Sequence, residues 1–198
     1  MQSINSATSR VISSAKVRPT LIGLKGIALG IGIVGSAAFG FKACGIADTF
    51  LLFPYHNDSR HLSSRVFDFF TMLGRTLFVP GLTEEVFWRV ALTPNPIADG
   101  SRGFSKLRLV LLLNTMFALY HLIPVLGAEK LGWMIPPGAP TVFSDPSFLA
   151  LAFVLGNACS FSYHVSFYGL YAPVLVHAVT VAFWLDACGG EKVLRGES

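Results

Sequence analysis

Glu84, Glu85 and Arg89 interrupt an apolar, aromatic-rich stretch that begins near Val66. Each ionisable group at membrane depth costs roughly 3 kcal/mol on insertion scales, so such groups require partners or a function. In a helix, Glu85 and Arg89 stand four residues apart and can pair on one face, while Glu84 is turned about 100° away. Glu84 is then free to act as a general base. The alternative is a helix-end salt bridge just outside the bilayer.

Two other apolar segments each carry a histidine. His121 follows Asn114 by seven residues, which places the two within about 20° of each other on a helix, facing one cavity. His177 lies in the middle of an apolar segment, with Thr180 one turn further on. Either histidine alone is equally well explained as a packing residue bonded to a carbonyl. Together with a glutamate pair on a third segment, they indicate one shared polar site.

Such a site can do two kinds of chemistry. Glu84 can deprotonate a water that attacks a peptide carbonyl, while imidazole or amide groups stabilise the oxyanion. Alternatively, carboxylates and histidines can bind a metal that activates the water. The sequence has no HExxH motif, so we expect no metal and no other cofactor. Cys44, Cys159 and Cys188 match no zinc spacing and are expected to be small, buried apolar residues.

The composition places the chain in a membrane. Of its 198 residues, 53% are hydrophobic and 13% charged, and a soluble domain carries about twice that charged fraction. The formal net charge of +4 is scattered between apolar runs without a dense basic patch, which argues against a nucleic-acid partner. We therefore expect membrane lipids as partners and a single domain.

The apolar segments predict an all-α fold, a polytopic transmembrane helical bundle of about five or six spans. Pro80 is expected to kink the second segment just before the acidic pair. The glycines of the first segment indicate close helix packing. The candidate spans are residues 21–41, 66–89, 109–125, 148–163 and 167–185.

Three motifs occur in a fixed order along these segments. Glu84 to Arg89 fits EExxxR, Phe117 to His121 fits FxxxH, and His177 to Val181 fits only the first half of a third motif. On these motifs the sequence resembles the CPBP family, the CAAX protease and bacteriocin-processing (Abi) group of intramembrane glutamic-type proteases, which is related to the Ras-converting CAAX prenyl endopeptidases. The resemblance covers roughly residues 66–186.

The resemblance implies a glutamate-dependent intramembrane endopeptidase that hydrolyses peptide bonds near the membrane surface, in a peptide or prenylated protein substrate. By this analogy Glu84 is the general base, and His121 and His177 orient water or stabilise the oxyanion. Glu85 and Arg89 are structural.

Val181 departs from the family pattern, in which the third motif ends in Asn or Asp four residues after the histidine, whereas this sequence has Val. Losing one oxyanion donor costs on the order of 100-fold or more in rate. Asn114 or Thr180 are candidate substitutes, with Phe117 as a further supporting residue. The alternative is a catalytically impaired member that serves as a membrane scaffold or assembly partner of another membrane protein. A proton-relaying transporter is disfavoured because no internal repeat is present.

The chain is expected to divide into three parts. Residues 1–20 are Ser-rich and basic, through Arg10, Lys16 and Arg18. They resemble a targeting segment, which would place the protein in a plastid or mitochondrial membrane, or equally a positive-inside anchor. Residues 21–188 form the membrane helical domain with the CPBP-like core at 66–186, and residues 189–198 form a polar tail expected to fray.

Overall fold

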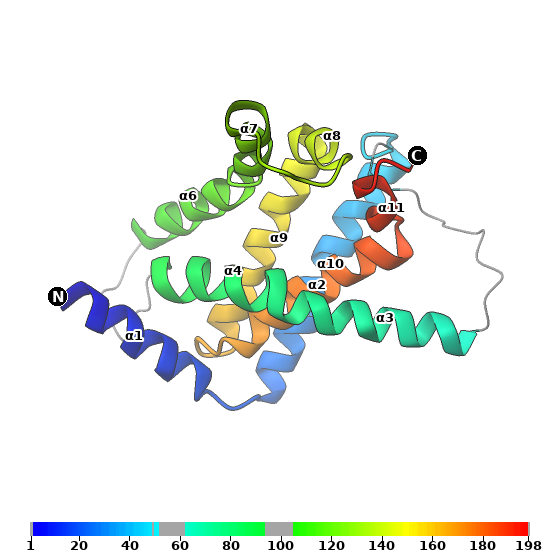
Figure 1. The fold of residues 1–198 in the computed structure, drawn as a ribbon. Helices are drawn as coiled ribbons and strands as arrows, with labels where there is room; N and C mark the ends of the chain where they lie inside the picture. Colours follow the sequence, from blue (N-terminus) through cyan, green and yellow to red (C-terminus); the bar gives the residue numbers. More distant parts are fainter. Residues whose placement is uncertain (1, 49, 52–61, 94–104, 198) are drawn as a thin grey trace.

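The computed structural model describes residues 2–48, 50–51, 62–93 and 105–197, and every regular element in these ranges is helical (Figure 1). The all-α prediction is thus confirmed. The elements are α1 (Gln2–Ala15), α2 (Leu21–Ala43), α3 (Leu62–Thr76), the π-helical η1 (Leu77–Leu82), α4 (Thr83–Glu85), the π-helical η2 (Val86–Leu92), α6 (Ser105–Leu119), α7 (Leu122–Leu131), α8 (Ala139–Ser144), α9 (Pro146–Val165), α10 (Tyr171–Ala187) and α11 (Gly190–Leu194).

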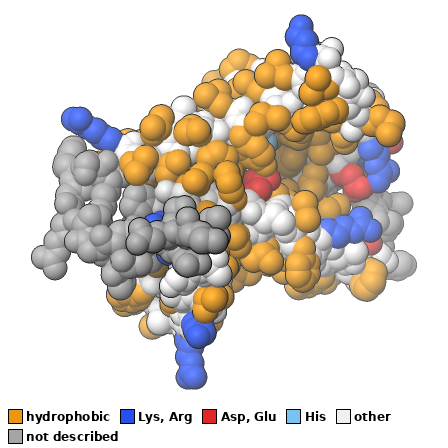
Figure 2. Space-filling model, turned by 60° about the vertical axis from the view of Figure 1, so that its left-hand side comes forward, with side chains coloured by type: hydrophobic (Ala, Val, Ile, Leu, Met, Phe, Trp, Pro, Cys, Tyr) orange, Lys and Arg blue, Asp and Glu red, His pale blue; other side chains and the backbone are white. Residues whose placement is uncertain are grey.

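Two of the described helices, α2 and α9, are long and apolar enough to cross a membrane. If the bent pair α6 and α7 together forms one span, the described helices provide three. Helix α10 is apolar but has only 17 residues. Large apolar side chains point outward, with Phe39 72% and Phe67 71% exposed, and orange covers much of the face in Figure 2. A surface of this kind suits lipid contact. The predicted count of five or six spans stays a prediction.

Glycines allow α2 to pack closely against α9 and α10. A Cβ atom on Gly30 would lie 3.1 Å from the Val176 side chain of α10, which is closer than most Cβ contacts. By contrast, Gly32 and Gly35 have no neighbour within 4 Å. The prediction of close glycine packing is confirmed for one face of α2. The core formed there comprises Ile27, Val34, Leu155, Ala158, Cys159, Ala172 and Val176.

The segment that carries the glutamates is kinked, as predicted from Pro80. Val79 has extended backbone angles (φ −134°, ψ 114°) inside an otherwise helical run, because proline has no N–H to bond the carbonyl of Thr76. A Cβ atom on Gly81 would lie 2.7 Å from that carbonyl oxygen and 3.3 Å from the Ala178 side chain. Glycine therefore allows the kink to sit directly on α10, and Figure 1 shows α3 and α4 lying across that helix.

The predicted third span is broken rather than continuous. Helix α6 ends at Leu119, and α7 leaves at an angle of 41°. Pro124 in the first turn of α7 cannot donate to the carbonyl of Tyr120, which accepts from Ile123 N at 2.9 Å instead. Tyr120 and His121 consequently lie in a turn. The expectation that Asn114 and His121 share one face of a single helix is wrong.

The fifth segment also begins later than predicted. Phe167 and Tyr168 have positive φ angles of 58° and 65°, which helices do not accommodate, so α10 starts only at Tyr171. The short connection between α9 and α10 therefore forms a tight turn at one end of the bundle.

The first and last described helices, α1 and α11, both contact the bundle. In α1, the buried Ser14 hydroxyl lies 3.1 Å from the Tyr163 hydroxyl, and the Ser14 carbonyl accepts from Leu170 N at 3.2 Å. At the other end, Val193 of α11 is buried and the Leu194 carbonyl accepts a hydrogen bond from Gly138 N. The prediction of a frayed tail is wrong for α11, because its apolar side packs against α8 and α10.

Candidate active site

Glu85 and Arg89 form a fully buried ion pair. Arg89 Nε donates to Glu85 Oε2 at 2.9 Å, and both side chains have 0% exposure. The pairing predicted from their four-residue spacing is confirmed. The attraction within a buried ion pair offsets the desolvation cost best when the remaining donors and acceptors are also satisfied. Here Arg89 Nη2 has no hydrogen-bond partner among the described residues.

Asn114 supplies the next partner of the guanidinium group. Its Oδ1 accepts from Arg89 Nη1 at 2.6 Å and from Ser160 Oγ at 3.1 Å, and its Nδ2 donates to Asn157 Oδ1 at 3.1 Å. Asn157 and Ser160 lie on α9, where Gly156 leaves room for α6 to approach. The structure thus places Asn114 in support of Arg89 and does not bring it to Glu84.

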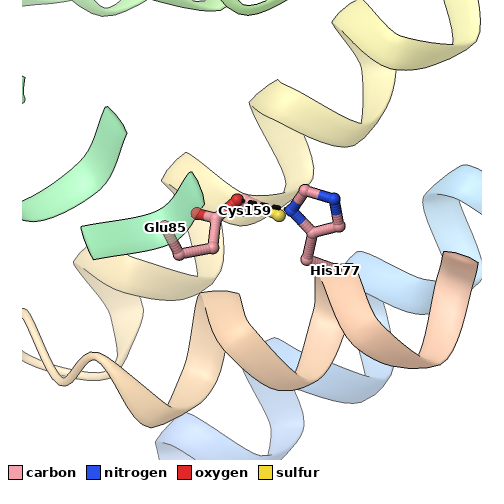
Figure 3. Close-up of side chains that lie close together, drawn as sticks. All are labelled: Glu85, Cys159 and His177. Carbon is pink, nitrogen blue, oxygen red and sulfur yellow. Dashed lines mark hydrogen bonds and ion pairs between the residues drawn. The ribbon is translucent and has the colours of Figure 1, made fainter. Parts of the chain in front are cut away.

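His177 of α10 contacts both glutamates. Its Nδ1 lies 2.8 Å from Glu85 Oε1, the contact drawn as a dashed line in Figure 3, and its Nε2 lies 3.8 Å from Glu84 Oε2. A carboxylate bonded to Arg89 can only accept, so Nδ1 carries the proton and Nε2 faces Glu84. The structure brings together three of the predicted site residues, Glu84, Glu85 and His177.

Glu84 is the more accessible of the two carboxylates, with 17% of its side chain exposed. Its Oε1 accepts a hydrogen bond from the Tyr120 hydroxyl. Its Oε2 is buried and has no hydrogen-bond partner among the described residues. As predicted, Glu84 is not the glutamate that pairs with Arg89. Figure 2 shows acidic atoms at the edge of a hollow in the apolar face.

Tyr120 is a site residue that sequence reasoning missed. In a continuous helix its side chain would be turned about 100° from that of His121. The break after α6 instead places both residues in one turn, with ring centroids 4.6 Å apart. Pro124 was the available signal, since a proline four residues after Tyr120 predicts the break.

His121 flanks the site without bonding a glutamate. Its Nδ1 lies 3.1 Å from the carbonyl oxygen of Phe117 and 3.2 Å from that of Ala118, so it satisfies the end of α6. No hydrogen bond joins it to Glu84 or Glu85 within the described ranges. The Phe117 ring stands between the two histidines, with centroids 5.4 Å from His121 and 5.8 Å from His177.

Val181, at the end of the third motif, is an apolar residue and also has apolar neighbours. Val181 is half-buried and packs against the α2–α9–α10 core. The Thr180 hydroxyl oxygen is buried, and no hydrogen-bond partner for it exists in the part of the chain that the structure describes. The Asn or Asp that ends the third motif in the family therefore has no counterpart at residue 181.

Cys159 of α9 lies beside the Glu85–His177 contact (Figure 3), and potential ligand atoms of the three residues fall within 4.8 Å of one another. Spacing along the chain gave no hint of this cluster. Because Arg89 is already bonded to Glu85, its positive charge opposes a metal cation there. Cys159 and Cys188 are buried as predicted, but Cys44 is exposed, so the prediction is wrong for Cys44.

Together, these features define an integral membrane helical protein with a buried glutamate–histidine site. The chain belongs to the family described as Type II CAAX prenyl endopeptidase Rce1-like, whose sequence model matches residues 66–183, from within α3 to within α10. This match confirms the resemblance drawn from the three motifs. No curated protein and no solved structure matches the chain.

Proposed function

We propose that this protein is a multi-pass membrane endopeptidase that uses Glu84 to activate water and hydrolyses a peptide bond near the membrane surface, in a prenylated CAAX-type substrate. The observation that carries the proposal is the 3.8 Å separation of Glu84 Oε2 and His177 Nε2. That distance is too long for a direct hydrogen bond and suits two groups that contact one water.

The hydrogen bond between His177 and Glu85 supports this role for the Glu84–His177 pair. With Nδ1 donating to Glu85, the Nδ1–H tautomer of His177 presents a lone pair at Nε2, which can accept one hydrogen of the water. Glu84 accepts the other proton. The resulting hydroxide adds to the scissile carbonyl carbon, and Glu84 returns the proton to the amine nitrogen as the carbon–nitrogen bond breaks.

The buried network keeps this geometry fixed. Glu85 is held by Arg89, and Arg89 is held by Asn114, which α9 fixes through Asn157 and Ser160. Pre-organisation of this kind lowers the cost of reorganisation when charge moves during a reaction. In this proposal Glu85 therefore acts by orienting His177 and does not react itself.

The surroundings of the glutamates support a lipid-linked substrate. The family is described by its action on prenyl CAAX proteins. On the same kinked segment, Phe78 is 66% and Phe87 is 52% exposed, so apolar side chains flank the site on the outside. A peptide tethered to the membrane by a prenyl group would approach across such a surface.

The test is cleavage of prenylated CAAX peptides by the purified protein in detergent, with Glu84→Ala as the comparator. The proposal requires wild-type cleavage that the substitution abolishes. Wild-type protein that cleaves no peptide in the panel, or a fully active Glu84→Ala variant, would contradict it.

A second candidate is a catalytically impaired family member that serves as a membrane scaffold or assembly partner. The apolar packing of Val181 favours it, because the amide of the third motif is missing. This candidate requires that Glu84→Gln supports the cellular role as well as the wild type does. Loss of that role with intact folding would count against it.

A further inference from the structure

The proposed hydrolysis, on which this inference rests, develops negative charge on the oxygen of the scissile carbonyl. Enzymes that form such an oxyanion place at least one hydrogen-bond donor toward it. In family members whose third motif ends in Asn, that side chain could supply the donor, but in this chain Val181 packs against apolar residues instead. The donor must therefore come from another residue.

Both histidines are poor donors in their neutral form. His177 Nδ1 is committed to Glu85, and His121 Nδ1 is committed to backbone carbonyls at the end of α6. A neutral imidazole with its proton on Nδ1 presents only an acceptor at Nε2. The amide nitrogen of Asn114 donates to Asn157, and its amide oxygen accepts from Arg89.

Tyr120 has the required donor at the required place. Its hydroxyl contacts Oε1 of Glu84, the carboxylate whose other oxygen faces His177. Its ring is held by Trp88, Phe117 and His121, with centroids 4.6 to 5.9 Å away. A phenol hydroxyl can turn about its C–O bond while the ring stays fixed.

We propose that the Tyr120 hydroxyl is the oxyanion donor of this enzyme, in place of the amide that is missing at Val181. Before attack, Glu84 carries the negative charge and holds the Tyr120 hydrogen by a charge-assisted bond. When Glu84 takes the proton from water, its charge is neutralised and a negative charge forms on the carbonyl oxygen. The hydroxyl then turns from Glu84 to the oxyanion, because hydrogen bonds to charged acceptors are the stronger ones.

The test compares Tyr120→Phe with the wild type in two measurements. The first is cleavage of the prenylated peptide, where kcat should fall on the order of 100-fold with little change in KM. The second is binding of two non-cleavable ligands, a tetrahedral phosphonate peptide and an N-methylated peptide. The substitution should weaken binding of the phosphonate by about the same factor as kcat and leave binding of the N-methylated peptide unchanged.

Tyr163→Phe is the matched control, since it removes another phenol hydroxyl, the one that lies 3.1 Å from the Ser14 hydroxyl of α1. It should leave both measurements unchanged. Equal weakening of both ligands, or an unchanged kcat in Tyr120→Phe, would overturn the inference while leaving Glu84-dependent cleavage standing. Failure of the wild type to cleave at all would overturn the proposed function, and this inference with it.

Discussion

The Nδ1 atom of His177 lies 2.8 Å from Oε1 of Glu85, so the second glutamate of the EExxxR motif is hydrogen-bonded to a histidine 92 residues further along the chain. The other oxygen of the same carboxylate accepts from Arg89. With both oxygens engaged and no exposure, Glu85 organises the site, and Glu84 is left as the carboxylate that can meet a substrate.

Glu85→Gln should disrupt the site and destabilise the fold. An amide presents a single acceptor oxygen, so either Arg89 or His177 loses its partner. Leaving a buried charge unpaired costs roughly 3–5 kcal/mol. We expect a lower melting temperature in detergent and loss of cleavage. Glu191→Gln, the same change in the exposed Glu191–Arg195 pair, should alter neither, and similar melting temperatures for the two variants would contradict this account.

Asn114→Ala should lower stability through the same network. The substitution leaves Arg89, Asn157 and Ser160 each without one buried hydrogen-bond partner, and each such loss costs about 1–3 kcal/mol. Thr115→Ala changes the neighbouring, exposed residue of α6 and serves as the control. Thermal unfolding should separate the two variants clearly, and a stable Asn114→Ala protein would show that the network does not hold the helices together.

Gly81→Ala should strain the kink that seats the glutamates on α10. The added methyl group would lie 2.7 Å from the Thr76 carbonyl oxygen, which is backbone and cannot easily move. We expect a loss of about 1–3 kcal/mol, as for other overpacked positions, together with reduced cleavage. Gly74→Ala, in α3 with nothing within 4 Å, should be neutral or slightly stabilising. Equal stability and equal cleavage rates of Gly81→Ala and Gly74→Ala would contradict this account.

Val181→Asn should not raise the cleavage rate. In this structure the side chain packs against an apolar core, where an amide without a partner costs about 1–3 kcal/mol. We expect lower stability and no gain in kcat. A clear gain in cleavage rate would mean that residue 181 reaches the oxyanion, and would favour a protease that has lost its usual donor.

The sequence was sufficient for those parts of the site that follow from local spacing. The Glu85–Arg89 pair is set by helical periodicity, and Pro80 predicts its kink because proline lacks an N–H. Polar side chains in apolar segments need polar partners, and His177 lies beside the glutamates as expected.

Other parts of the site depend on how the helices cross, which local spacing does not encode. Asn157 and Ser160 of α9 reach Asn114 of α6 where Gly156 permits close approach of the Asn114, Phe117 and Arg89 side chains. Tyr120 could have been predicted as a site residue only if Pro124 had been taken to break the helix. The burial of Ser14 depends on a contact with Tyr163, nearly 150 residues away, that no local pattern reveals.

The most direct test of the central claim is the cleavage rate of Glu84→Gln. The amide keeps the shape of the side chain and an oxygen that can accept from Tyr120, but it cannot take a proton from water. We predict a fall in kcat of about 10²–10⁴-fold, the usual contribution of a general base. The melting temperature of the variant should equal that of the wild type. Cleavage by Glu84→Gln at the wild-type rate would contradict the account.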